Sequence, residues 1–220
     1  MIGSTLRAEI CRVGRSLFER RLVAGTAGNI SVRLPADAGF LITPTDACLG
    51  FLEPDRLAQV DAQGRQVAGD PASKTFVLHR RIYTAEPQAH CVLHTHSTHL
   101  VALTLQGVWN AADVLPPITP YFVMKVGHVP LIPYCRPGSA QMADRVVQAI
   151  EVARARGRPI RAVLHDRLGP NVWHESPAAA MAALEELEET ARLWLMCDPK
   201  PAPLSAAALD ELRDTFGAQW

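Results

Sequence analysis

Residues 25–33 read Gly-Thr-Ala-Gly-Asn-Ile-Ser-Val-Arg and mark the point where the chain leaves a helix and enters a sheet. Glycine adopts backbone conformations that other residues avoid, so Gly25, Gly28 and Asn29 predict a tight loop. The residues that follow predict a strand. Upstream, apolar residues recur at helical spacing from Leu6 to Leu17, and Ser4 or Thr5 is a plausible N-cap. This stretch predicts an amphipathic helix that ends near residues 22–25.

The same mixture of helical and strand patterns continues downstream. Strands are predicted at residues 40–43, 58–61, 65–68, 89–95, 129–132 and 160–164. Helices are predicted at residues 74–85, at 99–105, around 142–153, from Ser176-Pro177 onward, and after an N-cap at Ser205. No internal repeat or domain-sized linker interrupts this order. We therefore expect one α/β domain over residues 1–220.

Composition excludes several classes of protein. The chain has 220 residues, with 22 basic residues balancing 22 acidic ones and a pI of about 7.1. Nucleic-acid binding needs a surplus of Lys and Arg, so we expect no nucleic-acid partner. No apolar stretch approaches the roughly 18 residues that a membrane helix needs, and the start lacks a signal-peptide pattern. Five scattered cysteines without a Cys-x-x-Cys motif fit reduced thiols, so we expect a cytoplasmic protein.

His94-x-His96 is the most specific chemical feature. Residues i and i+2 of a strand point to the same face, so two imidazoles at this spacing can share one metal ion. The spacing alone also fits one functional or core histidine beside one exposed histidine.

A second group of residues suits an anion. Gly28-Asn29 and Thr45 offer backbone and side-chain donors, and Ser73-Lys74 adds a hydroxyl and a positive charge at a predicted helix start. Each piece taken singly is better explained by turn chemistry or an N-cap. The acidic run at residues 185–189 is expected to be a solvated helix face, with Glu188 and Arg192 paired at i,i+4.

The order of these motifs resembles the class II aldolase/adducin family, from residue 6 to about residue 215. The matching segments are Gly25-x-x-Gly28-Asn29-Ile30-Ser31, Thr43-Pro44-Thr45, Gly69-Asp70 with Ser73-Lys74, His94-x-His96-Ser97, Thr119-Pro120-Tyr121, Val129 to Tyr134, Arg136-Pro137-Gly138 and Glu185 to Ala191. The resemblance implies a single αβα domain around a central, mainly antiparallel sheet flanked by helices. It also implies a homotetramer with active sites at subunit interfaces.

The resemblance further implies roles for individual residues. The family holds a divalent metal, usually zinc, with three histidines and sometimes a glutamate, and His94 and His96 fall on two of these ligands. Tyr121 falls where a neighbouring subunit usually supplies a catalytic tyrosine. The positions of the family's substrate-phosphate contacts are occupied by Gly28, Asn29, Thr45, Ser73 and Lys74.

Three positions depart from the family pattern. Thr75 stands where the family has its catalytic glutamate, and Leu168 stands at the third metal histidine. His79 and His165 are candidate substitutes for that ligand. Asp46 stands beside the phosphate site, where a carboxylate would repel a phosphate.

The resemblance therefore implies a metal-dependent carbon–carbon lyase that acts through an enediolate on a small, phosphorylated sugar acid or keto acid. Threonine cannot act as a base near neutral pH, whereas loss of carbon dioxide needs no base. The replacement by Thr75 thus favours decarboxylation over aldol cleavage. Two alternatives remain: a divergent family member acting on an unphosphorylated or aromatic keto acid, and a non-catalytic binding or assembly protein.

Overall fold

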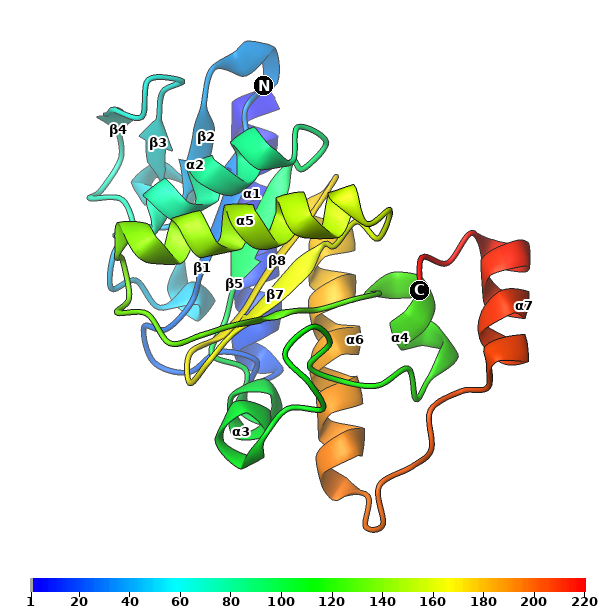
Figure 1. The fold of residues 1–220 in the computed structure, drawn as a ribbon. Helices are drawn as coiled ribbons and strands as arrows, with labels where there is room; N and C mark the ends of the chain where they lie inside the picture. Colours follow the sequence, from blue (N-terminus) through cyan, green and yellow to red (C-terminus); the bar gives the residue numbers. More distant parts are fainter. Residues whose placement is uncertain (1) are drawn as a thin grey trace.

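The computed structural model describes residues 2–220. The helices are α1 (Ile2–Glu19), α2 (Phe76–Ala85), α3 (Thr98–Gln106), α4 (Pro120–Lys125), α5 (Ala140–Ala155), α6 (Pro177–Met196) and α7 (Ala206–Phe216) (Figure 1). The strands are β1 (Asn29–Arg33), β2 (Phe40–Ile42), β3 (Ala58–Val60), β4 (Gln66–Ala68), β5 (Cys91–His94), β6 (Leu131–Ile132), β7 (Ala162–His165) and β8 (Gly169–His174).

All eight strands join one sheet in the order β4-β3-β2-β1-β5-β8-β7-β6. Every neighbouring pair is antiparallel except β6 and β7, which run parallel at one edge. The expected α/β fold around a mainly antiparallel sheet is confirmed. Strands β5 and β8, which pair near the middle of the sheet, are far apart in sequence, and their pairing brings the middle of the chain to its last third.

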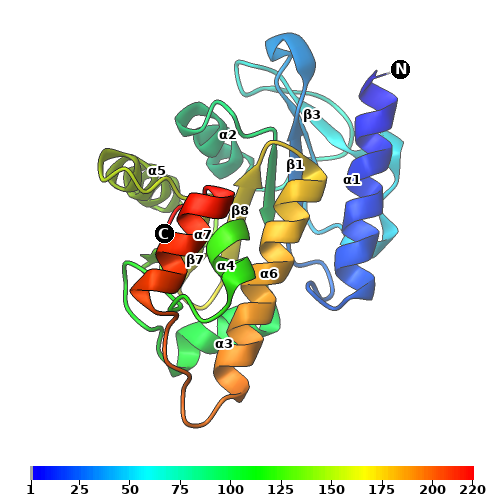
Figure 2. The same cartoon turned by 90° about the vertical axis from the view of Figure 1, so that its right-hand side faces the viewer.

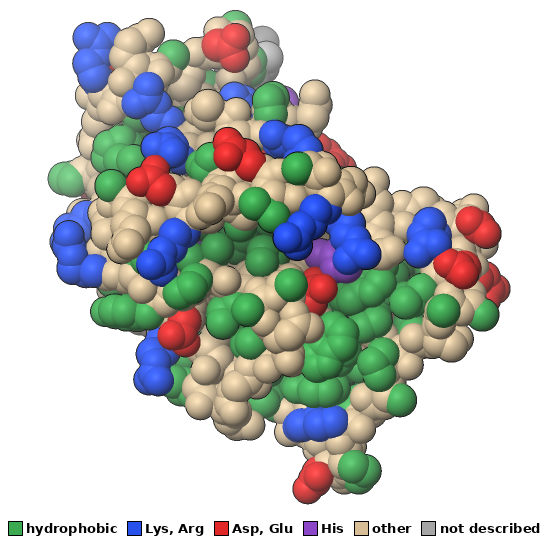
Figure 3. Space-filling model, viewed as in Figure 1, with side chains coloured by type: hydrophobic (Ala, Val, Ile, Leu, Met, Phe, Trp, Pro, Cys, Tyr) green, Lys and Arg blue, Asp and Glu red, His purple; other side chains and the backbone are tan. Residues whose placement is uncertain are grey.

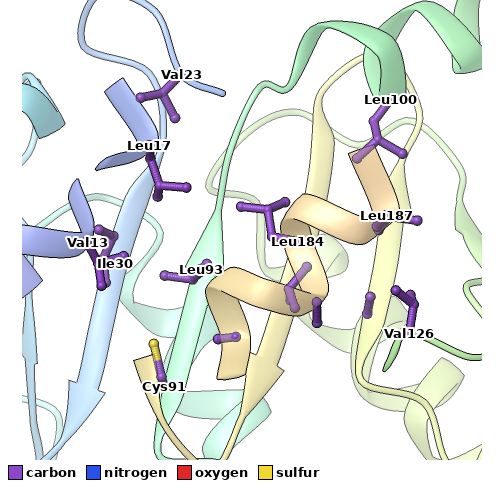
Figure 4. Packing of buried hydrophobic residues seen from close by; sticks show 14 of the residues in the cluster. Val13, Leu17, Val23, Ile30, Cys91, Leu93, Leu100, Val126, Leu184 and Leu187 are labelled. Atoms are coloured by element: carbon purple, nitrogen blue, oxygen red, sulfur yellow. The ribbon is translucent and has the colours of Figure 1, made fainter. Parts of the chain in front are cut away.

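Helices cover both faces of the sheet (Figures 1 and 2). One face packs against α1, α3 and α6, and Leu93 of β5 lies in the same apolar layer as Leu184 and Leu187 of α6 (Figure 4). The opposite face packs against α2 and α5, where Trp173 of β8 is 3% exposed. Each such leucine contributes roughly 1.5–3 kcal/mol through burial, so the two apolar layers hold the sheet in place.

The structure corrects two boundaries expected from the sequence and adds one strand. Helix α1 ends at Glu19, before residues 22–25. Strand β5 ends at His94, so His96 follows the strand and does not lie on it. Strand β8 was not expected at all, because Pro170 stands inside it and proline lacks the N–H that a ladder uses.

The expectation for the acidic run was wrong at Glu188. This side chain is 6% exposed, and its two oxygens accept hydrogen bonds from the backbone N–H groups of His99 and Leu100, both at 3.0 Å. Arg192 pairs with Glu189 instead, one residue closer in the helix. A carboxylate at the start of α3 satisfies N–H groups that have no partner within the helix, which explains its burial.

Along residues 2–220, none of the helices combines the length and the apolar character needed to cross a bilayer. The surface nevertheless carries large apolar side chains, which gather on the face below α5 and toward α4 (Figure 3). Exposed side chains of this kind include Phe51, Leu105, Trp109, Tyr121, Tyr134, Met196 and Phe216.

Candidate functional site

Three polar residues lie side by side across the middle of the sheet. Asn29 of β1 pairs with His94 of β5, and His94 pairs with Asn171 of β8. Directly paired residues of antiparallel strands place their side chains on the same face. This row lies on the α2/α5 face, and all three residues are at most 6% exposed. Three buried polar side chains in one row indicate a binding site.

The row opens into a cavity of about 200 Å³. The loop before β1, the loop after β2, the start of α2 and the ends of β5 and β8 line this cavity. Its walls are formed by Thr26, Ala27, Gly28, Asn29, Pro44, Thr45, Asp46, Ser73, Lys74, Thr75, Leu78, His94, His96, Pro137, Met142, Leu168 and Asn171. The structure thus brings together the predicted anion-binding residues and the two predicted metal ligands.

Glycines allow the strand ends to approach one another here. Gly28 has φ +85°, and a Cβ at this position would lie 2.8 Å from the backbone oxygen of His94. Gly169 has φ +118°, and its Cβ would lie 2.1 Å from the backbone oxygen of Thr95. Any larger residue would therefore push the loop and β8 away from the histidines.

One group of the lining residues is rich in hydrogen-bond donors. Ser73 is 8% exposed and its Oγ lies 3.0 Å from Oγ1 of Thr75, while Lys74 is exposed at the rim. Thr75 is the N-cap residue of α2, so the positive end of that helix's dipole lies beside these groups. Together with Thr45 and the backbone at Gly28, these groups suit an anion such as a phosphate.

The cavity wall also contains His94 and His96, whose ring centroids are 5.0 Å apart. The Nδ1–H of His94 donates to the backbone oxygen of Pro170 at 2.8 Å, which leaves Nε2 available. Burial lowers the pKa of His94 well below its ordinary value, and His96 and His165 lower it further. Burial also lowers the pKa of His96. Both imidazoles are therefore neutral at pH 7, the form in which histidine binds a metal.

The structure supplies no third histidine to this pair. Leu168 lines the cavity with an aliphatic side chain. His79 is fully buried with Nδ1 2.7 Å from Oγ of Ser31 and does not line the cavity. His165 lies behind the cavity, with its ring centroid 6.3 Å from that of His94.

Within residues 2–220, no three side chains of His, Cys, Asp or Glu form a group able to hold a metal ion. The neutral pair His94 and His96 fits two positions of a divalent-metal site. The donor set remains one protein ligand short of the three that catalytic zinc usually has. Neither His79 nor His165, the two candidate substitutes, stands in the cavity wall beside the pair.

Tyr121 is placed away from this cavity. It stands on α4, is 59% exposed, and lines a separate groove of about 770 Å³ between α4 and α6, with Arg20 and Glu185 among its neighbours. Within one chain, the structure does not bring Tyr121 to the histidines.

Asn171 is the site residue that the sequence did not reveal. A strand signal was present, since Val172-Trp173 lies between Gly169-Pro170 and Ser176-Pro177. That signal alone predicts that residue 171 lies in the sheet, but Pro170 argues against a strand because proline lacks the N–H that a ladder uses. The pairing of this strand with β5 is visible only in the tertiary structure.

The fold and this cavity place the chain in a known group: it belongs to the class II aldolase and adducin N-terminal domain family, whose model matches residues 8–195. The family generally uses a divalent metal. The family expected from the sequence is confirmed.

Two relatives and one solved structure are similar to this chain over nearly its whole length. The chain is 57% identical to 3-oxo-tetronate 4-phosphate decarboxylase of Cupriavidus necator, with 99% of this chain and 98% of that protein covered. It is 40% identical to the Escherichia coli protein of the same name, over 96% of this chain and 97% of the relative. Among solved structures, YgbL from Escherichia coli has a TM-score of 0.88 at 39% identity, covering 97% of this chain and all of that chain.

Proposed function

We propose that this chain is a decarboxylase of a phosphorylated 3-oxo sugar acid. Its relatives bear out the expected class, a carbon–carbon lyase of the class II aldolase type. One observation supports decarboxylation in particular. The cavity joins an anion-binding end to two neutral histidines and carries Thr75 at the position expected for a carboxylate base.

The chemistry of such a substrate needs no base in its first step. The oxo group at C3 is β to the carboxylate, so the C1–C2 bond breaks and its electron pair moves toward the C3 oxygen. Carbon dioxide leaves and an enediolate remains. A proton added at C2 then gives a phosphorylated three-carbon ketone. The protein must hold the phosphate, stabilise the oxygen that gains charge, and supply one proton.

Different residues of the cavity would hold the two parts of the substrate. Ser73, Lys74, Thr45 and the backbone at Gly28 would hold the phosphate, which fixes the orientation of the carbon chain. The oxo end of the substrate would then lie toward His94 and His96.

His94 and His96 would hold a divalent metal ion, with zinc as the first choice. When bound, it would supply positive charge next to the oxygen that becomes negative. The position of Leu168 means that this chain contributes fewer ligands than the family pattern implies.

The proposal also includes that the protein forms a homotetramer and is located in the cytoplasm. A cytoplasmic homotetramer would let Tyr121 of one subunit approach the cavity of another and serve as the proton donor. Two observations support the assembly: Tyr121 is exposed and does not line its own chain's cavity, and large apolar side chains gather on the surface (Figure 3).

The test measures carbon dioxide release from 3-oxo-tetronate 4-phosphate by purified, metal-supplemented protein. Ser73→Ala and Lys74→Met should raise KM by about tenfold or more, because each removes a donor from the phosphate. Lys200→Met is the matched control, since Lys200 donates to the backbone oxygen of Trp194 and does not line the cavity. No carbon dioxide release, with a folded protein and bound metal, would overturn the proposal.

A second candidate function rests on Asp46. This exposed residue has φ 54° and lines the anion end of the cavity, where its carboxylate opposes a phosphate. An unphosphorylated 3-oxo acid would avoid that repulsion. If the unphosphorylated substrate has the higher kcat/KM, and Asp46→Asn reverses the preference, the second function replaces the first.

A further inference from the structure

Asn171 is a buried polar residue in the cavity wall with half of its amide unused. It is 1% exposed, it lines the cavity, and it lies directly opposite His94 on the neighbouring strand. Its Oδ1 lies 2.8 Å from Nε2 of His165, but its Nδ2 has no hydrogen-bond partner. Buried donors are rarely left unpaired, so this one indicates a group that arrives with a ligand.

His165 fixes the orientation of this amide. The Nε2–H of His165 donates to Oδ1 of Asn171, and this bond directs Nδ2 away from His165. His165 is itself 2% exposed at the end of β7, so its ring is held by packing. The side chain of Asn171 is therefore set before any ligand enters.

We propose that the amide Nδ2–H of Asn171 donates a hydrogen bond to the substrate oxygen that gains negative charge when carbon dioxide leaves, and that His165 positions this amide. The inference rests on the proposed function and assigns a further residue to it. The acceptor is an oxygen atom of the enediolate. This enediolate is a three-carbon chain that carries a phosphate at its other end.

The surroundings of Asn171 favour this acceptor. An N–H group is repelled by a cation, so the amide in this orientation does not replace the missing metal ligand. Leu168 lines the same cavity and offers no hydrogen bond. A neutral donor held in a buried position needs no reorganisation as charge develops, which is what makes such donors effective in catalysis.

The first test is kinetic. Asn171→Val should lower kcat for decarboxylation by about 100-fold to 1000-fold with little change in KM, because the bond strengthens only as charge develops. His165→Leu should lower kcat less, and His165→Gln should restore part of it, since glutamine can donate to Oδ1. Ser139→Ala is the control: its Oγ is also buried and unpartnered but lies outside the cavity wall.

A second test does not depend on activity. Phosphoglycolohydroxamate carries a phosphate and a planar pair of oxygens like those of an enediolate, whereas inorganic phosphate carries only the anion. By calorimetry, Asn171→Val should weaken hydroxamate binding by about 100-fold and change phosphate binding by less than threefold, with the metal content unchanged.

The outcomes separate the two proposals. If wild-type protein releases no carbon dioxide but hydroxamate binding still depends on Asn171, the proposed function fails and the role of Asn171 as a donor to an oxygen ligand stands. Equal hydroxamate affinity in wild type and Asn171→Val overturns the inference. A loss of bound metal in Asn171→Val also overturns it, because the residue would then be a metal ligand.

Discussion

Glu188 of α6 accepts a hydrogen bond from the backbone N–H of His99 at 3.0 Å and contacts the Nδ1 of the same residue at 2.8 Å. It thereby ties α6 to the first turn of α3, which begins two residues after His96. A carboxylate on a helix face thus holds the start of α3, just after His96, against α6.

Removing this carboxylate should destabilise the fold. Glu188→Ala leaves two N–H groups at the start of α3 without partners and should lower the free energy of unfolding by about 2–4 kcal/mol. Urea unfolding followed by tryptophan fluorescence measures the change. Glu189→Ala is the matched control, because Glu189 forms an exposed pair with Arg192 that contributes about 0–1 kcal/mol. Equal losses in the two variants would contradict a capping role for Glu188.

A second prediction concerns the residue at the base position. If loss of carbon dioxide needs no base, Thr75→Glu should leave the decarboxylation rate within about tenfold of wild type. The rate is measured by carbon dioxide release at saturating substrate. Thr75→Val, which keeps the shape but removes the hydroxyl near Ser73, is the control for packing. An increase of several orders of magnitude in Thr75→Glu would show that decarboxylation by this protein does depend on a base, and would contradict the base-free first step.

The metal site gives a third prediction. Leu168→His places an imidazole in the cavity wall that already holds His94 and His96. Because a third protein ligand tightens a zinc site, we expect the affinity for zinc to rise by about tenfold or more. Competition with a chelating dye measures it. The variant His94→Ala combined with Leu168→His should lose the gain, and an unchanged affinity in Leu168→His would mean that residue 168 does not reach the ion.

The fourth prediction is a pH dependence of stability. Burial lowers the pKa of His79 to about 3, whereas an unfolded histidine titrates near 6.5. Between these values the unfolded chain binds the extra proton, so stability is complete above pH 6.5 and falls as the pH drops toward 3. At pH 4.5, two units below the unfolded pKa, His79 alone should cost about 3 kcal/mol.

Urea midpoints measured between pH 7 and 4.5 test this prediction. His79→Gln should be less stable at pH 7, because it loses the contact with Ser31, but its stability should depend less steeply on pH. His90→Gln, which alters an exposed side chain, is the comparison. Parallel pH profiles for wild type and His79→Gln would contradict the assignment of this proton to His79.

The local features of this protein can be predicted from its amino-acid sequence. Helical spacing of apolar residues predicted α2, α5 and α6, and Ser205 marked the start of α7. The motifs at Gly28-Asn29, Ser73-Lys74 and His94-x-His96 predicted the residues that line the cavity. These features depend on contacts within a few residues of the chain, so their patterns are visible without a structure.

The way in which distant segments meet is visible only in the folded chain. The pairing of β5 with β8 places Asn171 opposite His94, although 77 positions separate them in the sequence. Glu188 looked solvated because its neighbours are acidic, yet α3 packs over it and supplies N–H groups. Register, burial and the choice of partner follow from the packing of the whole chain. For that reason the sequence showed which residues carry chemistry, and the fold decided which of them act together.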